Sequence, residues 1–118
     1  MDIEQLREYC VAKPAVTEEF PFGPDTLVFK VGGKMFALKK DAEEPLRINL
    51  KCNPLYALEL RSLYESIIPG YHMNKKHWNT VICDGTVEEK LIKSMIDDSY
   101  ELVFNSLSKK EQVRLLDS

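Results

Sequence analysis

One stretch of the sequence, "PGYHMNKKHWNTVICDG" at residues 69–85, gathers the side chains with the widest chemical range. It holds both histidines, two adjacent lysines and the only tryptophan of the 118 residues. This mixture is compatible with a metal site, a catalytic site, a nucleic-acid surface or a well-packed corner of a small domain. The spacing of the residues, and the elements that carry them, discriminate among these possibilities.

A metal site is the weakest of the four interpretations. His72 and His77 lie five residues apart, about 17 Å on an extended chain. Zinc needs three or four such ligands that converge on one point. A tight turn at "NKK" would close the gap, but the ligand count stays low. We therefore expect no metal and no cofactor.

Enzyme chemistry has the right residue types but no supporting pattern. Cys83, His77 and Asp84 could act as nucleophile, base and orienting acid. Cys83 alternates within an apolar strand, however, which is typical of a small buried hydrophobe. The "VGGK" segment lacks the spacing of a phosphate-binding loop. We expect no catalytic residues, and a protein that is not an enzyme.

Nucleic-acid binding fits the charge pattern better. The net charge of −3 argues against a strongly basic binder, yet residues 28–80 hold 9 of the 16 Lys and Arg and only 5 of the 19 acids. A basic middle in an acidic frame can orient a polyanion. Cations contact phosphates, amides read base edges and an indole stacks on bases. The candidate DNA contacts are Lys30, Lys34, Lys39, Lys40, Arg47, Lys51, Asn74, Lys75, Lys76, His77, Trp78 and Asn79.

Simpler interpretations of these residues stay open. Trp78 could anchor the core boundary with its indole N–H bonded, and the lysines could be ordinary solubilising surface. The same surface could also serve a protein partner, in which case a flat apolar area should lie beside it. We expect any DNA binding to be weak and salt-sensitive.

Hydrophobic periodicity predicts the elements that position these residues. Strands are expected at 26–31, 34–40, 46–52 and 77–83, and helices at 2–13, 54–65 and 87–105, with a short terminal helix after them. The Gly-Gly pair between the first two strands suits a primed hairpin turn. Predicted helix starts are Asp2, Asn53 with Pro54, and capping boxes at Thr86–Glu89 and Ser108–Glu111, with a bend near Asp97–Asp98.

This order predicts one α+β domain over residues 1–118, with a two-layer architecture. An antiparallel sheet should carry helices on one face and leave a polar, open face on the other. Cys10, Cys52 and Cys83 should be buried and unpaired, as in a reduced cytoplasmic protein, and we expect a monomer without a membrane span. The predicted core is Leu27, Phe29, Phe36, Ile48, Leu50, Leu58, Val81, Leu91, Met95 and Val103.

Several segments together resemble a known family. They are "EFPFGPDTLVFKVGGKMFAL", "LKCNP", "PGYHMNKKHWNTVICDG", "SYELV" and "LSKK", in this order over nearly the whole chain. The sequence resembles the MmcQ/YjbR family of small bacterial proteins. That resemblance implies a fold similar to CyaY (frataxin). It also implies DNA binding through a "double wing" of β-hairpins.

Overall fold

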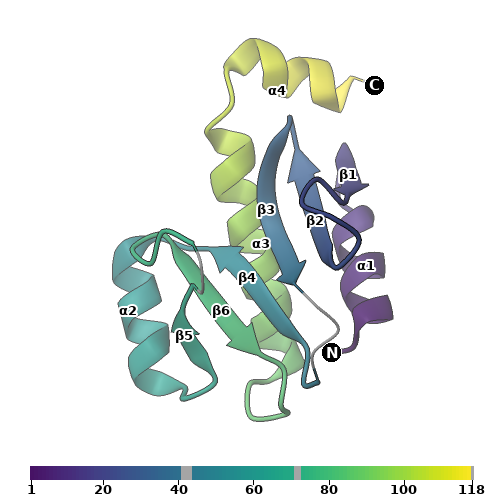
Figure 1. The fold of residues 1–118 in the computed structure, drawn as a ribbon. Coiled ribbons are helices and arrows are strands. Elements are labelled where there is room, and N and C mark those ends of the chain that lie inside the picture. The colour runs from purple at the N-terminus through teal and green to yellow at the C-terminus, as the bar shows by residue number, and fades with distance from the viewer. Residues whose placement is uncertain (41–43, 71–72, 118) are drawn as a thin grey trace.

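A six-stranded antiparallel sheet organises the molecule, and four helices accompany it (Figure 1). The structure, a computed structural model, describes residues 1–40, 44–70 and 73–117. The strands lie in the order β1-β2-β3-β4-β6-β5. The predicted α+β class is confirmed. The strand bounds are β1 Val16–Glu19, β2 Thr26–Val31, β3 Lys34–Lys40, β4 Arg47–Lys51, β5 Ile67–Pro69 and β6 Trp78–Ile82.

The four predicted strands correspond to β2, β3, β4 and β6 within about one residue. The remaining two, β1 and β5, are not among the predicted strands. Both are edge strands of three or four residues, and β5 ends in Pro69. Short edge strands pair on one side only and carry little alternating pattern, which explains why they escape a sequence-based prediction.

The helices are α1 Ile3–Val11, α2 Pro54–Leu63, α3 Glu89–Asn105 and α4 Lys109–Leu116. Asp2 caps α1 in a capping box with Gln5, and Asn53 caps α2 through the N–H groups of Leu55 and Tyr56. None of the helices in the described part of the chain is both long and apolar enough to cross a membrane.

Two details predicted for α3 are wrong. Thr86 does not cap it, because Glu88 takes the N-cap position and the Thr86 hydroxyl bonds to Asp84 instead. The helix also runs through Asp97 and Asp98 without a bend. Asp97 accepts hydrogen bonds from Tyr9 and Lys13, so its side chain is satisfied by groups from outside α3 and does not compete for the helix backbone.

Ser108 caps α4 as predicted, through the N–H of Glu111. The Glu111 carboxylate pairs with Arg114 and not with the cap.

One hydrophobic cluster joins α1, α2 and α3 to the inner face of the sheet. It includes Leu6 of α1, Leu60 of α2, Met95 of α3 and the inward residues Phe29 and Ile48. A β-bulge after Phe29 turns both Phe36 and Ala37 of β3 into this cluster. These three helices therefore share one face of the sheet, as expected.

Two residues of the predicted core are not fully buried. Leu58 is 60 % exposed, because α2 buries Ala57 and Leu60 and turns the next position outward. Leu91 is only partly buried, although it packs against the cluster. Among the cysteines, Cys10 and Cys52 are buried but Cys83 is half-buried, so the expectation of three buried thiols is wrong at that position; all three are free.

The Gly-Gly hairpin turn between β2 and β3 has φ angles of +59° at Gly32 and +79° at Gly33. Positive φ at both positions is what a type I′ turn requires. A Cβ on Gly32 would also lie 2.6 Å from Cδ1 of Leu107, in the link between α3 and α4. One side of the hairpin tip thus packs against the link between α3 and α4.

Candidate nucleic-acid interface

The face of the sheet turned away from α3, here called the outer face, carries one continuous row of paired residues. Strand register aligns Val28, Leu38, Asn49, Thr80 and Ile68 across five strands. The first four are at most 8 % exposed, and the Thr80 hydroxyl donates to Asn49 Oδ1. The centre of this face is therefore a packed surface, and the expectation of an open polar face holds only for its flanks.

Cations flank this row on both sides. Arg47 and Lys51 alternate with the inward residues of β4, and Lys40 ends β3 opposite Thr26 of β2. Lys30 lies on the same face, but its Nζ is 3.4 Å from Glu19 Oε1 of the neighbouring strand β1. Its charge is thus partly neutralised within the protein. Lys40, Arg47 and Lys51 lie on the same outer face.

A compact turn at residues 74–77 presents Lys75 and Lys76. The backbone oxygen of Asn74 accepts from the N–H groups of His77 and Trp78, and its side-chain oxygen accepts from Lys76 N at 3.0 Å. Asn74 therefore builds the turn. Both lysines are exposed at its tip, where phosphates could reach them.

Arg61 of α2 supports this turn from behind. Its guanidinium donates to the backbone oxygens of Lys75 and Trp78 and, through Nε, to Asn79 Oδ1 at 2.6 Å. Asn79 is 0 % exposed, and its Nδ2 has no hydrogen-bond partner among the described residues. Two backbone carbonyls and the buried Asn79 side chain thus hold the Arg61 guanidinium in place, and the guanidinium in turn holds the 74–77 turn.

Trp78 stands at the corner between this turn and the outer face. It pairs in register with Lys51, so the half-buried indole and the ammonium group share the outer face. Gly70 lies directly across from it: Gly70 N donates to Trp78 O at 2.8 Å, and a Cβ on Gly70 would be 2.7 Å from Trp78 Cβ. Only a glycine allows this approach without displacement.

The structure separates several residues that the sequence had grouped. Lys39 faces Leu27 on the inner side of the sheet, opposite to Lys40. Lys34 lies at the hairpin tip with its Nζ 3.4 Å from Ser106 Oγ. Asn79 is buried under Arg61, and His72 falls outside the described residues. The fold places Lys40, Arg47, Lys51 and Trp78 on the outer face, and it places Lys75 and Lys76 on the turn that precedes Trp78, together with Asn74 and His77.

Arg61 and Gly70 are the two residues of this region that sequence reasoning missed as organisers. The Gly70 signal was present, because a glycine after a short apolar run marks a close backbone approach. For Arg61 there was no local signal, since its partners lie 14 to 18 residues away along the chain.

A second polar cluster closes the far end of β6. Asp84 accepts hydrogen bonds from the hydroxyls of Ser66 and Thr86, both at 2.6 Å, and from the N–H of Thr86 at 3.0 Å. These donors stabilise the carboxylate and lower the pKa of Asp84 to about 2. The described residues contain no group of three His, Cys, Asp or Glu placed to hold a metal ion. We therefore assign this cluster a structural role, in which its hydrogen bonds stabilise the turn between β6 and α3.

Comparison with known proteins identifies the family. The family model described as YjbR matches residues 11–102 of the chain. The chain belongs to the YjbR family. It is 41 % identical over 112 residues to "Uncharacterized protein YbdF" of Escherichia coli O157:H7, covering 95 % of this chain and 92 % of that protein. It is 32 % identical over 116 residues to YjbR of Escherichia coli K12, covering 98 % of both.

Solved structures of the same fold agree with this assignment. The crystal structure of Deinococcus radiodurans protein DR2400, with the domain DUF419, superposes with a TM-score of 0.91 at 44 % identity. That comparison covers 96 % of this chain and 86 % of the other. A Pseudomonas syringae protein superposes with a TM-score of 0.76 at 32 % identity, covering 87 % of this chain and 99 % of that one. The predicted membership of the MmcQ/YjbR family is confirmed.

Proposed function

We propose that this YjbR-family protein is a cytoplasmic DNA-binding protein, without catalytic residues, that contacts duplex DNA weakly and with little sequence preference. The observation that carries the proposal is the placement of Lys40, Arg47 and Lys51 on one face, beside a hydrogen-bonded turn bearing Lys75 and Lys76. Exposed cations on fixed backbone contact phosphates regardless of sequence. The family resemblance, which implies DNA binding, supports the same reading.

The spacing on β4 suits a double-stranded ligand. Arg47 and Lys51 lie on the same face four residues apart, about 13 Å at the rise of a β-strand. A B-DNA major groove is about 12 Å wide, so the two cations can reach phosphates on opposite walls of one groove. Trp78, paired with Lys51, adds an aromatic edge at the boundary of this surface.

A DNA titration by fluorescence anisotropy tests the proposal. Binding should weaken with salt, with a log–log slope near −0.9 per phosphate neutralised. The paired change Lys75→Ala with Lys76→Ala, and separately Arg47→Ala with Lys51→Ala, should each lower affinity and make that slope shallower by about one to two. Lys39→Ala is the matched control, because Lys39 lies on the opposite side of the sheet from Lys40.

Two outcomes would redirect the proposal. The absence of binding at low salt would remove DNA as a ligand. Equal losses in the control and in both double variants would show a non-specific charge effect and no defined surface.

A protein partner is the second candidate function, and one observation favours it. Leu55, Leu58 and Leu63 of α2 are 79 %, 60 % and 65 % exposed, an apolar surface on the helix that also carries Arg61. Exposed leucines gathered on one helix commonly mark protein contacts. If DNA binding fails, Leu55→Glu with Leu58→Glu should abolish association with the partner, while both changes leave the melting temperature nearly unaltered.

A further inference from the structure

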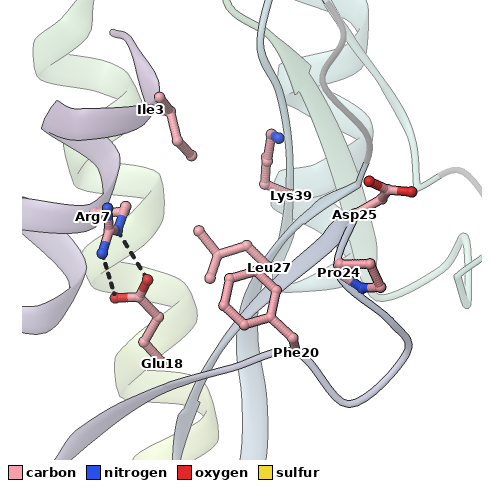
Figure 2. Close-up of a pocket in the computed structure, with 8 residues that line it drawn as sticks. All are labelled: Ile3, Arg7, Glu18, Phe20, Pro24, Asp25, Leu27 and Lys39. Carbon is pink, nitrogen blue, oxygen red and sulfur yellow. Dashed lines mark hydrogen bonds and ion pairs between the residues drawn. The ribbon is translucent and has the colours of Figure 1, made fainter.

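A pocket of about 350 Å³ lies on the inner side of the sheet, between α1 and the ends of β2 and β3 (Figure 2). This volume is within the usual range of small-molecule sites. The pocket does not involve the outer face proposed to contact DNA, because Leu27 and Lys39, which line it, face the helices.

Its apolar wall is formed by Ile3, Phe20 and Leu27. Leu27 is 5 % exposed and belongs to the core, whereas Phe20 is 52 % exposed. Figure 2 shows the Phe20 ring beside the Leu27 side chain, with Ile3 across the opening. An aromatic or aliphatic group entering the pocket would cover the exposed part of the Phe20 ring, which water otherwise contacts.

The loop that holds Phe20 is constrained. Gly23 N donates to Phe20 O at 3.3 Å, and Thr26 N donates to Gly23 O at 3.3 Å. Pro21 and Pro24 limit the backbone further, and Gly23 adopts a φ of +111°. The loop therefore presents Phe20 in a defined position, which lowers the entropic cost of binding a ligand against it.

Two cations, Arg7 and Lys39, line the pocket, and among the described residues only Arg7 has a side-chain partner. Arg7 is already engaged: its Nε lies 2.9 Å from Glu18 Oε1 and its Nη2 lies 3.5 Å from Glu18 Oε2. This pair forms a wall that is neutral overall. Lys39 is half-buried, and its side chain makes no hydrogen bond or ion pair with another residue in the part of the chain that the structure describes. Asp25 is exposed, and it lies on the far side of Leu27 from Arg7 in Figure 2.

We propose that this pocket binds a small organic carboxylate, with its apolar body against Phe20 and Leu27 and its carboxylate on the ammonium of Lys39. An ammonium group beside an apolar wall selects ligands that carry one compact anionic group on an apolar body. The neutral Arg7–Glu18 pair adds no second anion site, so dianions gain little.

The test is a titration of ¹⁵N-labelled full-length protein with 3-phenylpropionate, followed by amide chemical shifts. Saturable shifts are expected at Ile3, Phe20, Leu27 and Lys39, and none at Thr80 on the outer face. The neutral analogue 3-phenylpropan-1-ol should bind about fivefold more weakly, because it lacks the charge-assisted contact to Lys39.

Two matched pairs of variants make the test specific. Lys39→Met should weaken binding about fivefold while Lys40→Met, its neighbour on the opposite face, leaves it unchanged. Phe20→Ala should weaken binding while Phe22→Ala leaves it unchanged, because Phe22 is exposed in the same loop but does not line the pocket. Melting curves establish that each variant is folded; if Phe20→Ala does not fold, the lysine pair decides.

Several results would overturn the proposal. They are shifts that do not saturate in the millimolar range, equal losses in Lys39→Met and Lys40→Met, or equal binding of the acid and the alcohol. The outcome is independent of DNA binding, since Lys39→Met should leave the DNA titration unchanged.

Discussion

Arg61 of α2 and Asn79 of β6 are joined side chain to side chain, with Arg61 Nε 2.6 Å from Asn79 Oδ1. The same guanidinium holds the backbone oxygens of Lys75 and Trp78. A part-buried contact between two elements thus helps to determine where the exposed lysines of the 74–77 turn point. The proposed DNA surface therefore depends on a residue that does not itself need to touch DNA.

Replacing Arg61 should disorder this turn. Arg61→Met removes all three hydrogen bonds and leaves Asn79 with a buried amide that has lost its partner. We expect a loss of about 1–3 kcal/mol in unfolding free energy, measured in urea. Amide hydrogen exchange at His77 and Trp78 should speed up more than exchange in β2. Arg114→Met, which removes an exposed pair within α4, is the control and should cost less than about 0.5 kcal/mol. Equal effects of the two changes would contradict the role given to Arg61.

The contact between Gly70 and Trp78 can be tested with the only tryptophan as its own reporter. Gly70→Ala places a Cβ 2.7 Å from Trp78 Cβ, so the chain must shift. Overpacking of this kind costs about 1–3 kcal/mol. The emission maximum of Trp78 should move, and DNA affinity should fall if the indole borders the interface. If both the emission spectrum and the stability stay unchanged, the backbone around Gly70 and Trp78 can shift at little energetic cost.

Alanine substitutions at two leucines test which residues belong to the core. Leu50 is 1 % exposed on β4 and Leu58 is 60 % exposed on α2. Leu50→Ala should cost about 2–5 kcal/mol in unfolding free energy, because it empties a packed site. Leu58→Ala should stay within about 0.5 kcal/mol. A large cost at Leu58 would mean that its surface is covered in solution, by a second copy or another partner.

These residues also show what sequence patterns can reveal. Strict alternation identified β4 and placed Leu50 inward and Lys51 outward, because a strand has a period of two. Helical periodicity is less precise on a short helix at the edge of a sheet, where only a narrow stripe is buried, and so Leu58 was placed inside. Lys39 and Lys40 were grouped by charge alone, although adjacent strand residues must face opposite ways. The hydrogen bonds of Arg61 depend on how α2 packs against β6, and no local sequence spacing predicts that packing.

Thiol reactivity should follow the burial of the three cysteines. Cys83 is half-buried, whereas Cys10 and Cys52 are buried. Burial raises the pKa of the Cys10 thiol to about 12 and also raises the pKa values of Cys52 and Cys83, so all three should react slowly near neutral pH. Mass spectrometry after timed labelling of the native protein should find Cys83 modified first, with Cys83→Ser as control. Earlier labelling of Cys10 would indicate that α1 detaches from the sheet.

The last prediction concerns acid stability and the Asp84 cluster. Hydrogen bonds from Ser66 and Thr86 lower the pKa of Asp84 to about 2, whereas an aspartate in the unfolded chain titrates near about 3.9. The folded state therefore binds this proton less readily, and Asp84 stabilises the fold above about pH 4. That contribution is lost as the pH falls from about 4 to about 2. Asp84→Asn should thus be less stable than the wild type at pH 6, and the two unfolding free energies should converge toward pH 2.

Ser66→Ala keeps the Asp84 carboxylate but removes the hydrogen bond from the Ser66 hydroxyl. Its unfolding free energy should therefore also approach that of the wild type toward pH 2, from a smaller difference at pH 6. Urea titrations between pH 2 and 6 measure all three proteins; a constant difference across this range would show that the Asp84 carboxylate does not gain its stability from these donors.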